Sequence, residues 1–132
     1  KRLDGDLAIV DKRRSGPSET EVMNIIGEVE GKNVLLIDDM ISTAGTITDA
    51  AKAVKRHGAK DVYIAATHAV MCGSAWEKLA KAPIKKLVFT NTIPTKVPAG
   101  SRVPVEVLSM APTLGEAIRR IHLNLSVSAL FT

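Results

Sequence analysis

The segment 34–46, VLLIDDMISTAGT, constrains the fold more than any other part of this 132-residue chain. It begins with four consecutive apolar residues, 34–37, and then continues with Asp38 and Asp39. A short, continuous apolar run is typical of a strand that is covered on both faces of a parallel sheet. Ligands of such sheets bind at the carboxyl ends of the strands. The segment therefore predicts an α/β fold with a polar site where this strand ends.

The turn after the two aspartates has the composition of a phosphate-binding site. It consists of Ser42, Thr43, Ala44, Gly45 and Thr46, and apolar residues at helical spacing follow it. The unpaired N–H groups at a helix N-terminus attract anions, and glycine lets the backbone approach an anion closely. Each hydrogen bond to a charged phosphate contributes about 1.5–3 kcal/mol, so this turn is predicted to bind a monophosphate.

The carboxylates of Asp38 and Asp39 complement such a turn. They can accept hydrogen bonds from the vicinal hydroxyls of a sugar, directly or through a magnesium-bound water. A strand that ends in one Asp usually marks only a strand end or a helix cap. The complete pattern of strand, acid pair and hydroxyl-rich turn favours a sugar-phosphate site.

Strand and helix signals alternate along the rest of the chain. Strand-like runs cover 61–66, 86–90 and 103–110, the last near a sheet edge because Pro104 cannot donate to a ladder. Helical spacing covers 47–54, before Gly58, and two later segments in which Ser74 and Thr113 are predicted N-caps. This alternation predicts one domain with a mainly parallel sheet flanked by helices on both faces.

Composition limits the classes of function. The net charge of +4 comes from scattered cations, and only 3% of the residues are aromatic, which argues against a nucleic-acid-binding protein. No apolar stretch reaches membrane-spanning length, and the N-terminus lacks the pattern of a signal peptide. The single Cys72 excludes an internal disulfide framework and fits a reducing cytoplasm. A modest preference for an anionic substrate accounts for the charge.

A cationic triplet forms a second motif near the start of the chain. Lys12, Arg13 and Arg14 follow a short predicted strand, 7–10, and precede a loop that contains Gly16 and Pro17. A lone triplet of this kind is usually a solvated turn. A mobile cationic loop also suits phosphoryl transfer, where the protein mainly positions the reactants and neutralises charge.

The two motifs together resemble the ribose-phosphate diphosphokinase family, whose members make phosphoribosyl diphosphate and have the type I phosphoribosyltransferase fold. Further matches are Thr67-His68, 91–93, the helix EAIRRIH and the ending SVSALF, so the resemblance covers nearly the whole chain. It implies transfer of the diphosphoryl group of ATP to the 1-hydroxyl of ribose 5-phosphate.

The resemblance also implies roles for individual residues. Lys12 and Arg14 are expected to act on the transferred group, Asp38 and Asp39 to bind the ribose hydroxyls, and 42–46 to bind the 5-phosphate. Ser42 stands where the family usually has an acid. The serines that match Ser126 and Ser128 contribute to a regulatory phosphate site at a subunit contact in this family, although two tail serines in a turn are an equally good interpretation.

By the same resemblance, 1–132 is the C-terminal domain of a longer enzyme. The adenine-binding residues and most Mg²⁺ ligands are expected in an N-terminal half, no metal ligand is assigned in this chain, and the fragment alone is expected to be inactive. The assembly implied is a homo-oligomer of the hexamer-of-dimers type, without nucleic-acid or membrane partners.

Four alternatives remain open from the sequence. A base-transferring phosphoribosyltransferase shares the turn but would not explain the cationic triplet, and a non-catalytic regulatory homologue would not need Lys12 or Arg14. A transcriptional regulator of the same fold would need a DNA-binding domain. A receiver-type signalling domain would place its phosphoacceptor Asp at a later strand end, where Thr67-His68 or Thr90-Asn91 stand.

Overall fold

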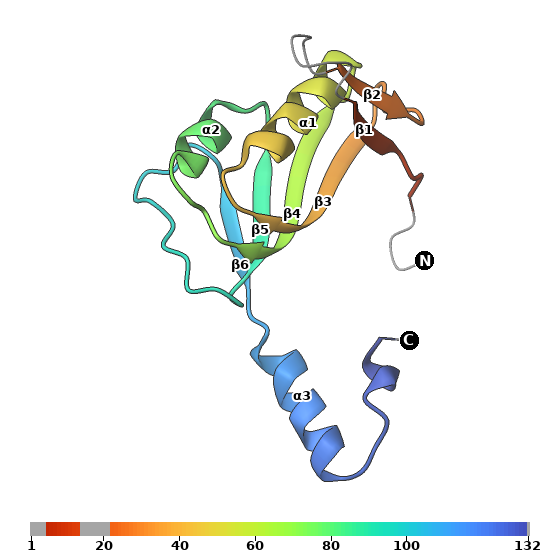
Figure 1. The fold of residues 1–132 in the computed structure, drawn as a ribbon, viewed down its shortest axis with the longest axis vertical. Coiled ribbons are helices and arrows are strands. Elements are labelled where there is room, and N and C mark those ends of the chain that lie inside the picture. Colours follow the sequence, from red (N-terminus) through yellow and green to blue (C-terminus); the bar gives the residue numbers. More distant parts are fainter. Residues whose placement is uncertain (1–4, 14–21, 132) are drawn as a thin grey trace.

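The computed structural model describes residues 5–13 and 22–131 of the chain. Strands and helices alternate through most of this part (Figure 1). In chain order the elements are β1 (Ile9–Arg13), β2 (Val22–Ile26), β3 (Asn33–Ile41), α1 (Gly45–Arg56), β4 (Asp61–Ala69), α2 (Ala75–Lys81), β5 (Lys86–Thr90), β6 (Val105–Leu108), α3 (Ala111–His122) and the 3₁₀ turn η1 (Ser128–Leu130).

A four-stranded parallel sheet forms the centre of the molecule, with its strands in the order β3-β4-β5-β6. Every pairing in this sheet is parallel, so the carboxyl ends of all four strands lie at one edge. The α/β class and the parallel sheet predicted from the sequence are confirmed, as is the edge position of the strand that follows Pro104. The first two strands form a separate antiparallel hairpin, β1-β2, which the sequence had not indicated.

The apolar core lies between this sheet and the two helices α1 and α2. Ile64 of β4 and Leu87 of β5 are fully buried, and Phe89 is 1% exposed. The ring of Phe89 packs edge-on against Trp76 of α2, with 6.4 Å between the ring centroids. Because each fully buried side chain of this size contributes about 1.5–3 kcal/mol, this layer fixes the positions of the strand ends and of the turns beyond them.

In one respect the sheet differs from the expectation of helices on both faces. The helices α1 and α2 contact each other and lie on the same face. On the other face Leu35 is 43% exposed and Ile37 is 65% exposed. The reason is topological: β3, β4 and β5 are neighbours in chain order, so each right-handed crossover steps in the same direction and leaves its helix on the same side.

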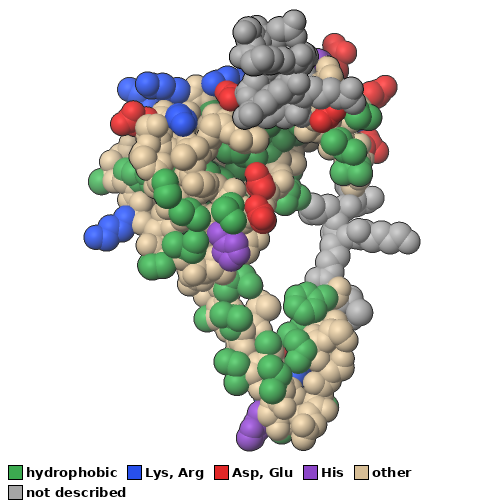
Figure 2. All heavy atoms as spheres, in the orientation of Figure 1, with side chains coloured by type: hydrophobic (Ala, Val, Ile, Leu, Met, Phe, Trp, Pro, Cys, Tyr) green, Lys and Arg blue, Asp and Glu red, His purple; other side chains and the backbone are tan. Residues whose placement is uncertain are grey.

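The last helix, α3, leaves the sheet after β6, and the C-terminal tail turns back beside it (Figure 1). Its apolar side chains Leu114, Ile118 and Ile121 are 57%, 68% and 64% exposed. Hydrophobic side chains accordingly gather along this part of the surface in Figure 2. In the described part of the chain, no helix is long and apolar enough to cross a membrane.

Of the two predicted helix caps, Thr113 is wrong, and Ser74 is confirmed in position only. Helix α3 begins at Ala111 with Pro112 in its first turn, so Thr113 lies inside the helix and not at its cap. Ser74 does occupy the N-cap position of α2, but its side chain makes no capping hydrogen bond. Proline at the start of a helix has its φ angle already set, which explains the earlier start of α3.

Candidate functional site

The two aspartates lie in the last part of β3, at the carboxyl edge of the sheet. Asp38 is half-buried and Asp39 is exposed. The backbone N–H of Asp39 donates a hydrogen bond to Oδ1 of Asp38 at 2.9 Å, which orients the Asp38 carboxylate. Asp38 lies opposite Ala66 of β4 in the register. Among the described residues neither carboxylate forms an ion pair, so their remaining acceptor sites are available to a ligand.

The turn after β3 leads directly into α1. Ala44 is buried and adopts a left-handed conformation, with φ 59° and ψ 9°, and the helix begins at Gly45. The bond from the Thr48 N–H to the Ala44 carbonyl, at 3.2 Å, opens the helical ladder. No side chain caps this N-terminus, and the first turn of α1 contains no acidic residue. Among the described residues, first-turn N–H donors of α1 thus remain available to an anion.

Two backbone hydrogen bonds tie this turn to the loop after β4. The N–H of Met71 donates to the Ile41 carbonyl at 3.0 Å, and the N–H of Cys72 donates to the Ser42 carbonyl at 2.9 Å. Cys72 itself is exposed. The side chains of Ser42 and Thr43 are also exposed. The loop after β4 therefore holds the backbone of the turn in place, while the hydroxyl groups of Ser42 and Thr43 face solvent.

Lys78 of α2 is a residue of this site that the sequence analysis missed. A Cβ atom added at Gly45 would lie 4.0 Å from the Lys78 Nζ and 3.9 Å from the Thr43 Oγ1. The space directly over Gly45 is thus flanked by an ammonium group and a hydroxyl group. Lys78 has no ion-pair partner within the described ranges. Its contribution depends on how α2 packs beside α1. Because this contact is long-range, no local sequence motif predicts it.

A network of hydroxyl groups and one histidine lies at the carboxyl ends of β4 and β5. His68 pairs with Met40 in the register, next to the aspartates, and its Nδ1 lies 2.8 Å from the Thr92 Oγ1. The hydroxyls of Thr90 and Thr92 lie 2.7 and 3.1 Å from the Thr67 carbonyl. All three contacts are satisfied if His68 donates from Nδ1 to Thr92.

The cationic triplet is described only in part. Lys12 and Arg13 belong to β1, opposite Met23 and Val22 of β2. The sequence analysis had ended this strand at residue 10. The strand continues because β2 supplies an antiparallel partner for its backbone. Arg14 lies outside the described residues, and so do the side chains of Lys12 and Arg13, so the expectation for Lys12 and Arg14 remains a prediction.

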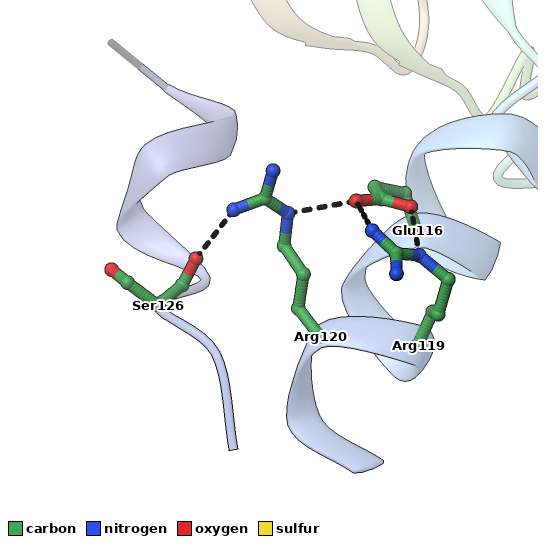
Figure 3. A network of polar contacts seen from close by, with 4 residues as sticks. All are labelled: Glu116, Arg119, Arg120 and Ser126. Carbon is green, nitrogen blue, oxygen red and sulfur yellow. Dashed lines mark hydrogen bonds and ion pairs between the residues drawn. The ribbon is translucent and has the colours of Figure 1, made fainter. Parts of the chain in front are cut away.

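The two tail serines lie close together. The Oγ atoms of Ser126 and Ser128 are 2.7 Å apart, and the Arg120 Nη1 donates to the Ser126 carbonyl at 2.9 Å. Arg120 also binds Glu116, which Arg119 binds with two hydrogen bonds (Figure 3). The hydrogen bonds from Arg119 and Arg120 lower the pKa of Glu116 to about 2. The tail is thus attached to α3 near a cationic side chain.

Comparison with known proteins identifies relatives along nearly the whole chain. Residues 9–132 match the phosphoribosyl synthetase-associated domain. A ribose-phosphate pyrophosphokinase of Gloeobacter violaceus is 54% identical over 129 residues, which is 97% of this chain and 38% of that protein. The enzyme of the same name from Caldanaerobacter subterraneus is 50% identical over 132 residues, or 99% of this chain and 41% of the relative.

A solved structure agrees with these matches. The phosphoribosylpyrophosphate synthetase from Mycobacterium smegmatis superposes with a TM-score of 0.71 and 41% sequence identity, over 80% of this chain and 35% of that one. The chain thus spans about two fifths of the length of the curated relatives it matches. With a strand, an acid pair and an uncapped helix N-terminus arranged as described, the chain belongs to the family of the phosphoribosyl synthetase-associated domain.

Proposed function

We propose that this chain is part of an enzyme that transfers the diphosphoryl group of ATP to the 1-hydroxyl of ribose 5-phosphate, producing phosphoribosyl diphosphate and AMP. In this reaction the 1-hydroxyl oxygen forms a bond to the β-phosphorus of ATP. The bond between the β-phosphorus and the oxygen that links it to the α-phosphorus breaks, and AMP leaves with that oxygen. The names of the relatives support this reaction. The chain supplies the ribose 5-phosphate site and part of the catalytic cationic loop.

The uncapped N-terminus of α1 is the observation that carries the proposal. The turn 42–46 presents backbone donors, two exposed hydroxyls at its start and a helix dipole at one point. The 5-phosphate binds in this turn, and Ser42 and Thr43 donate to it. Ser42 in place of an acid leaves the backbone donors unchanged and removes one negative charge from beside the phosphate.

Asp38 and Asp39 bind the ribose hydroxyls in this proposal. Two carboxylates without cationic partners also fit Mg²⁺, which typically binds one or two carboxylates and completes its shell with water and substrate phosphates. Within residues 5–13 and 22–131, no three His, Cys, Asp or Glu side chains cluster as a metal site. In this proposal most of the metal's ligands come from the substrates or from elsewhere in the longer protein. When bound, the cation neutralises phosphate charge.

Lys12 and Arg14 act on the transferred group. Lysine offers a compact positive charge, and the arginine fork can hold two phosphate oxygens. The two-stranded hairpin β1-β2 carries Lys12 and Arg13, the first two residues of the triplet, at the end of β1.

Lys78 also belongs to the phosphate site in this proposal. Its ammonium group lies beside the space over Gly45 that a phosphate would occupy. In this proposal its positive charge neutralises part of the charge of the 5-phosphate.

The same proposal places the chain as one C-terminal domain of type I phosphoribosyltransferase fold in a cytoplasmic homo-oligomer. The neighbouring hydroxyls of Ser126 and Ser128, with Arg120 bound to the Ser126 carbonyl, support a regulatory phosphate site in the tail. The single cysteine of the chain is compatible with a reducing compartment.

The substitution Gly45→Ala tests the phosphate turn without disturbing the fold. Gly45 does not require a positive φ angle, and the added methyl group makes only ordinary contacts. Stability against urea should therefore be unchanged or up to about 1 kcal/mol higher, because alanine favours the helix. The methyl group occupies the space between Thr43 Oγ1 and Lys78 Nζ, so calorimetry should show affinity for ribose 5-phosphate reduced about tenfold, or about 1.4 kcal/mol.

Gly115→Ala in α3 is the matched control, because it adds the same methyl group to a helix at a place where it meets nothing within 4 Å. It should leave ribose 5-phosphate binding unchanged. Equal affinity of both variants would place the phosphate elsewhere and refute this assignment of the turn.

A further inference from the structure

Thr48 of α1 is the one polar residue that is buried in the described part of the chain, with 2% of its surface exposed. Its helix packs into the core through Ile47 and Ala51, among other residues. Burial of a hydroxyl group costs free energy unless the group is hydrogen-bonded. A valine would fill nearly the same space without this cost, so the hydroxyl group of Thr48 calls for an explanation.

Two donors of Thr48 bind the carbonyl group of Ala44. The Thr48 hydroxyl donates to the Ala44 carbonyl oxygen at 2.7 Å, and the Thr48 N–H donates to the same oxygen at 3.2 Å. The Thr48 Oγ1 also lies 3.0 Å from the carbonyl oxygen of Gly45, the first residue of α1. A hydroxyl group has a single proton, so the two carbonyl groups share it. One buried side chain thus fixes the direction of two successive carbonyl groups.

The direction of these carbonyl groups determines where two N–H groups point. A trans peptide unit is planar, so its N–H points opposite to its C=O. The Ala44 carbonyl and the Gly45 N–H belong to one unit, and the Gly45 carbonyl and the Thr46 N–H belong to the next. Because both carbonyl groups point toward Thr48, both N–H groups point away from it, out of the N-terminus of α1. These are the donors that the proposed 5-phosphate meets.

The conformation of Ala44 gives this contact more weight. Its φ of 59° is unfavourable for a residue with a Cβ atom. The N–H bond of 3.2 Å lies at the long end of the usual range, whereas the hydroxyl bond of 2.7 Å has the usual length for its type. The hydroxyl group is therefore the closer of the two donors that hold the turn in this orientation.

We propose that Thr48 is a positioning residue for ribose 5-phosphate, acting through the backbone of the turn and without touching the ligand. Its hydroxyl group holds the Gly45 and Thr46 N–H groups in the orientation that binds the 5-phosphate. Donors that are already oriented lose less freedom when the ligand arrives, and affinity gains accordingly. This inference rests on the proposed function and adds to it a residue that lies behind the phosphate turn.

Nitrogen-15 NMR of the chain tests this role, with inorganic phosphate and ribose 5-phosphate as the probes. In the unchanged protein both ligands should move the amide proton signals of Gly45 and Thr46 downfield. Thr48→Val removes the hydroxyl group and nearly keeps the shape of the side chain. Both ligands should bind this variant about fivefold more weakly, the loss expected of one hydrogen bond, and the downfield shifts at saturation should be smaller.

Two further variants separate orientation from packing. Thr48→Ser keeps the hydroxyl group and loses a buried methyl group, so it should unfold at lower urea concentration and still bind both ligands like the unchanged protein. Ile47→Val shortens a neighbouring side chain that is 8% exposed, and it should likewise lose stability and keep its affinity. Normal binding in these two destabilised variants, beside weak binding in Thr48→Val, is a pattern that a role in packing alone does not produce.

Three results would overturn the proposal, and they have different meanings for the phosphate turn. If Thr48→Val binds both ligands as tightly as the unchanged protein, Thr48 has no positioning role and the turn stands as the phosphate site. If Thr48→Ser or Ile47→Val binds as weakly as Thr48→Val, the loss of affinity comes from packing. If neither ligand shifts the Gly45 and Thr46 signals of the unchanged protein, the assignment of the turn fails, and the role of Thr48 fails with it.

Discussion

A single left-handed residue determines the direction in which α1 leaves the turn. Ala44 has a φ of 59° and is 4% exposed. A left-handed conformation costs about 1–2 kcal/mol for a residue with a Cβ atom. The surrounding structure carries this strain at the centre of the proposed phosphate site, where strained backbone often accompanies function.

Replacement of Ala44 should show this strain directly. Ala44→Val should lower the free energy of unfolding by about 2–4 kcal/mol, because a β-branched residue tolerates positive φ poorly and the site is closely packed. Ala44→Gly relieves the strain but removes a buried methyl group, so its effect should stay within about 1 kcal/mol. Urea denaturation measures both changes. Equal losses for the two variants would indicate that packing alone decides this position.

Lys78 should contribute to phosphate affinity through its charge. Two unit charges about 4 Å apart in water interact with about 1 kcal/mol, so Lys78→Met should weaken ribose 5-phosphate binding about fivefold at low salt. The difference in affinity between Lys78→Met and the unchanged protein should shrink in 1 M salt, where charges more than about 3 Å apart are largely screened. Lys60→Met, beside the amino end of β4, is the control. If Lys60→Met weakens binding as much in calorimetry, the effect comes from net charge and not from the site.

At the scale of elements, the strand–turn–helix unit could be predicted from the sequence, because its signals are local. The apolar run 34–37, the acid pair and the turn are contiguous, and each requires only its neighbours in the chain. Lys78 and the hydroxyl groups of Thr90 and Thr92 were not predicted as parts of the site. They reach the sheet edge only after α2 and β5 have packed beside the turn.

The difference between local and long-range signals also explains the wrong cap of α3 and the missed hairpin β1-β2. Thr113 and Glu116 have the spacing of a capping box, but Pro112 starts α3 earlier and Glu116 binds two arginines instead. The hairpin was missed because β1 and β2 depend on each other for their backbone hydrogen bonds. A pair of short strands gives a weaker sequence signal than one long apolar strand.

The attachment of the tail to α3 should depend on pH through Glu116. The hydrogen bonds from Arg119 and Arg120 lower the Glu116 pKa from 4.5 to about 2 in the folded protein. A lowered acid pKa contributes stability above the unfolded pKa and loses it as pH falls toward the folded pKa. Exchange of the Leu125 amide, which donates to the Arg120 carbonyl, should therefore be constant from pH 7 to pH 4.5, after correction for intrinsic rates, and accelerate between pH 4.5 and 2.

The variant Glu116→Gln is the control for this window. It cannot ionise, so the corrected exchange of the Leu125 amide should be independent of pH over the same range. The same acceleration in Glu116→Gln would assign the effect to other acids.

At the scale of the whole molecule, the proposed function gives the described part of the chain one complete substrate site but only part of a catalytic centre. The acid pair and the phosphate turn converge at the sheet edge. In the proposed function, the adenine-binding residues belong to another part of the longer protein. A two-substrate reaction needs both reactants in near-attack geometry, which can contribute about 7–11 kcal/mol to lowering the barrier.

A sample confirmed at 14.1 kDa should therefore bind ribose 5-phosphate but form no phosphoribosyl diphosphate from ATP. Phosphorus NMR of the reaction mixture would detect the product and the AMP released with it. Turnover by this chain alone would show that it carries every residue the reaction needs, contrary to the domain assignment.

The backbone bond between Cys72 and Ser42 has a practical consequence for measuring these equilibria. The chain contains one cysteine, it is exposed, and its amide is bonded to the first residue of the phosphate turn. A thiol-reactive fluorophore would attach at this position alone and would sit beside the turn without any engineered residue. Its emission would then report, in real time and at low protein concentration, each arrival and departure of a ligand.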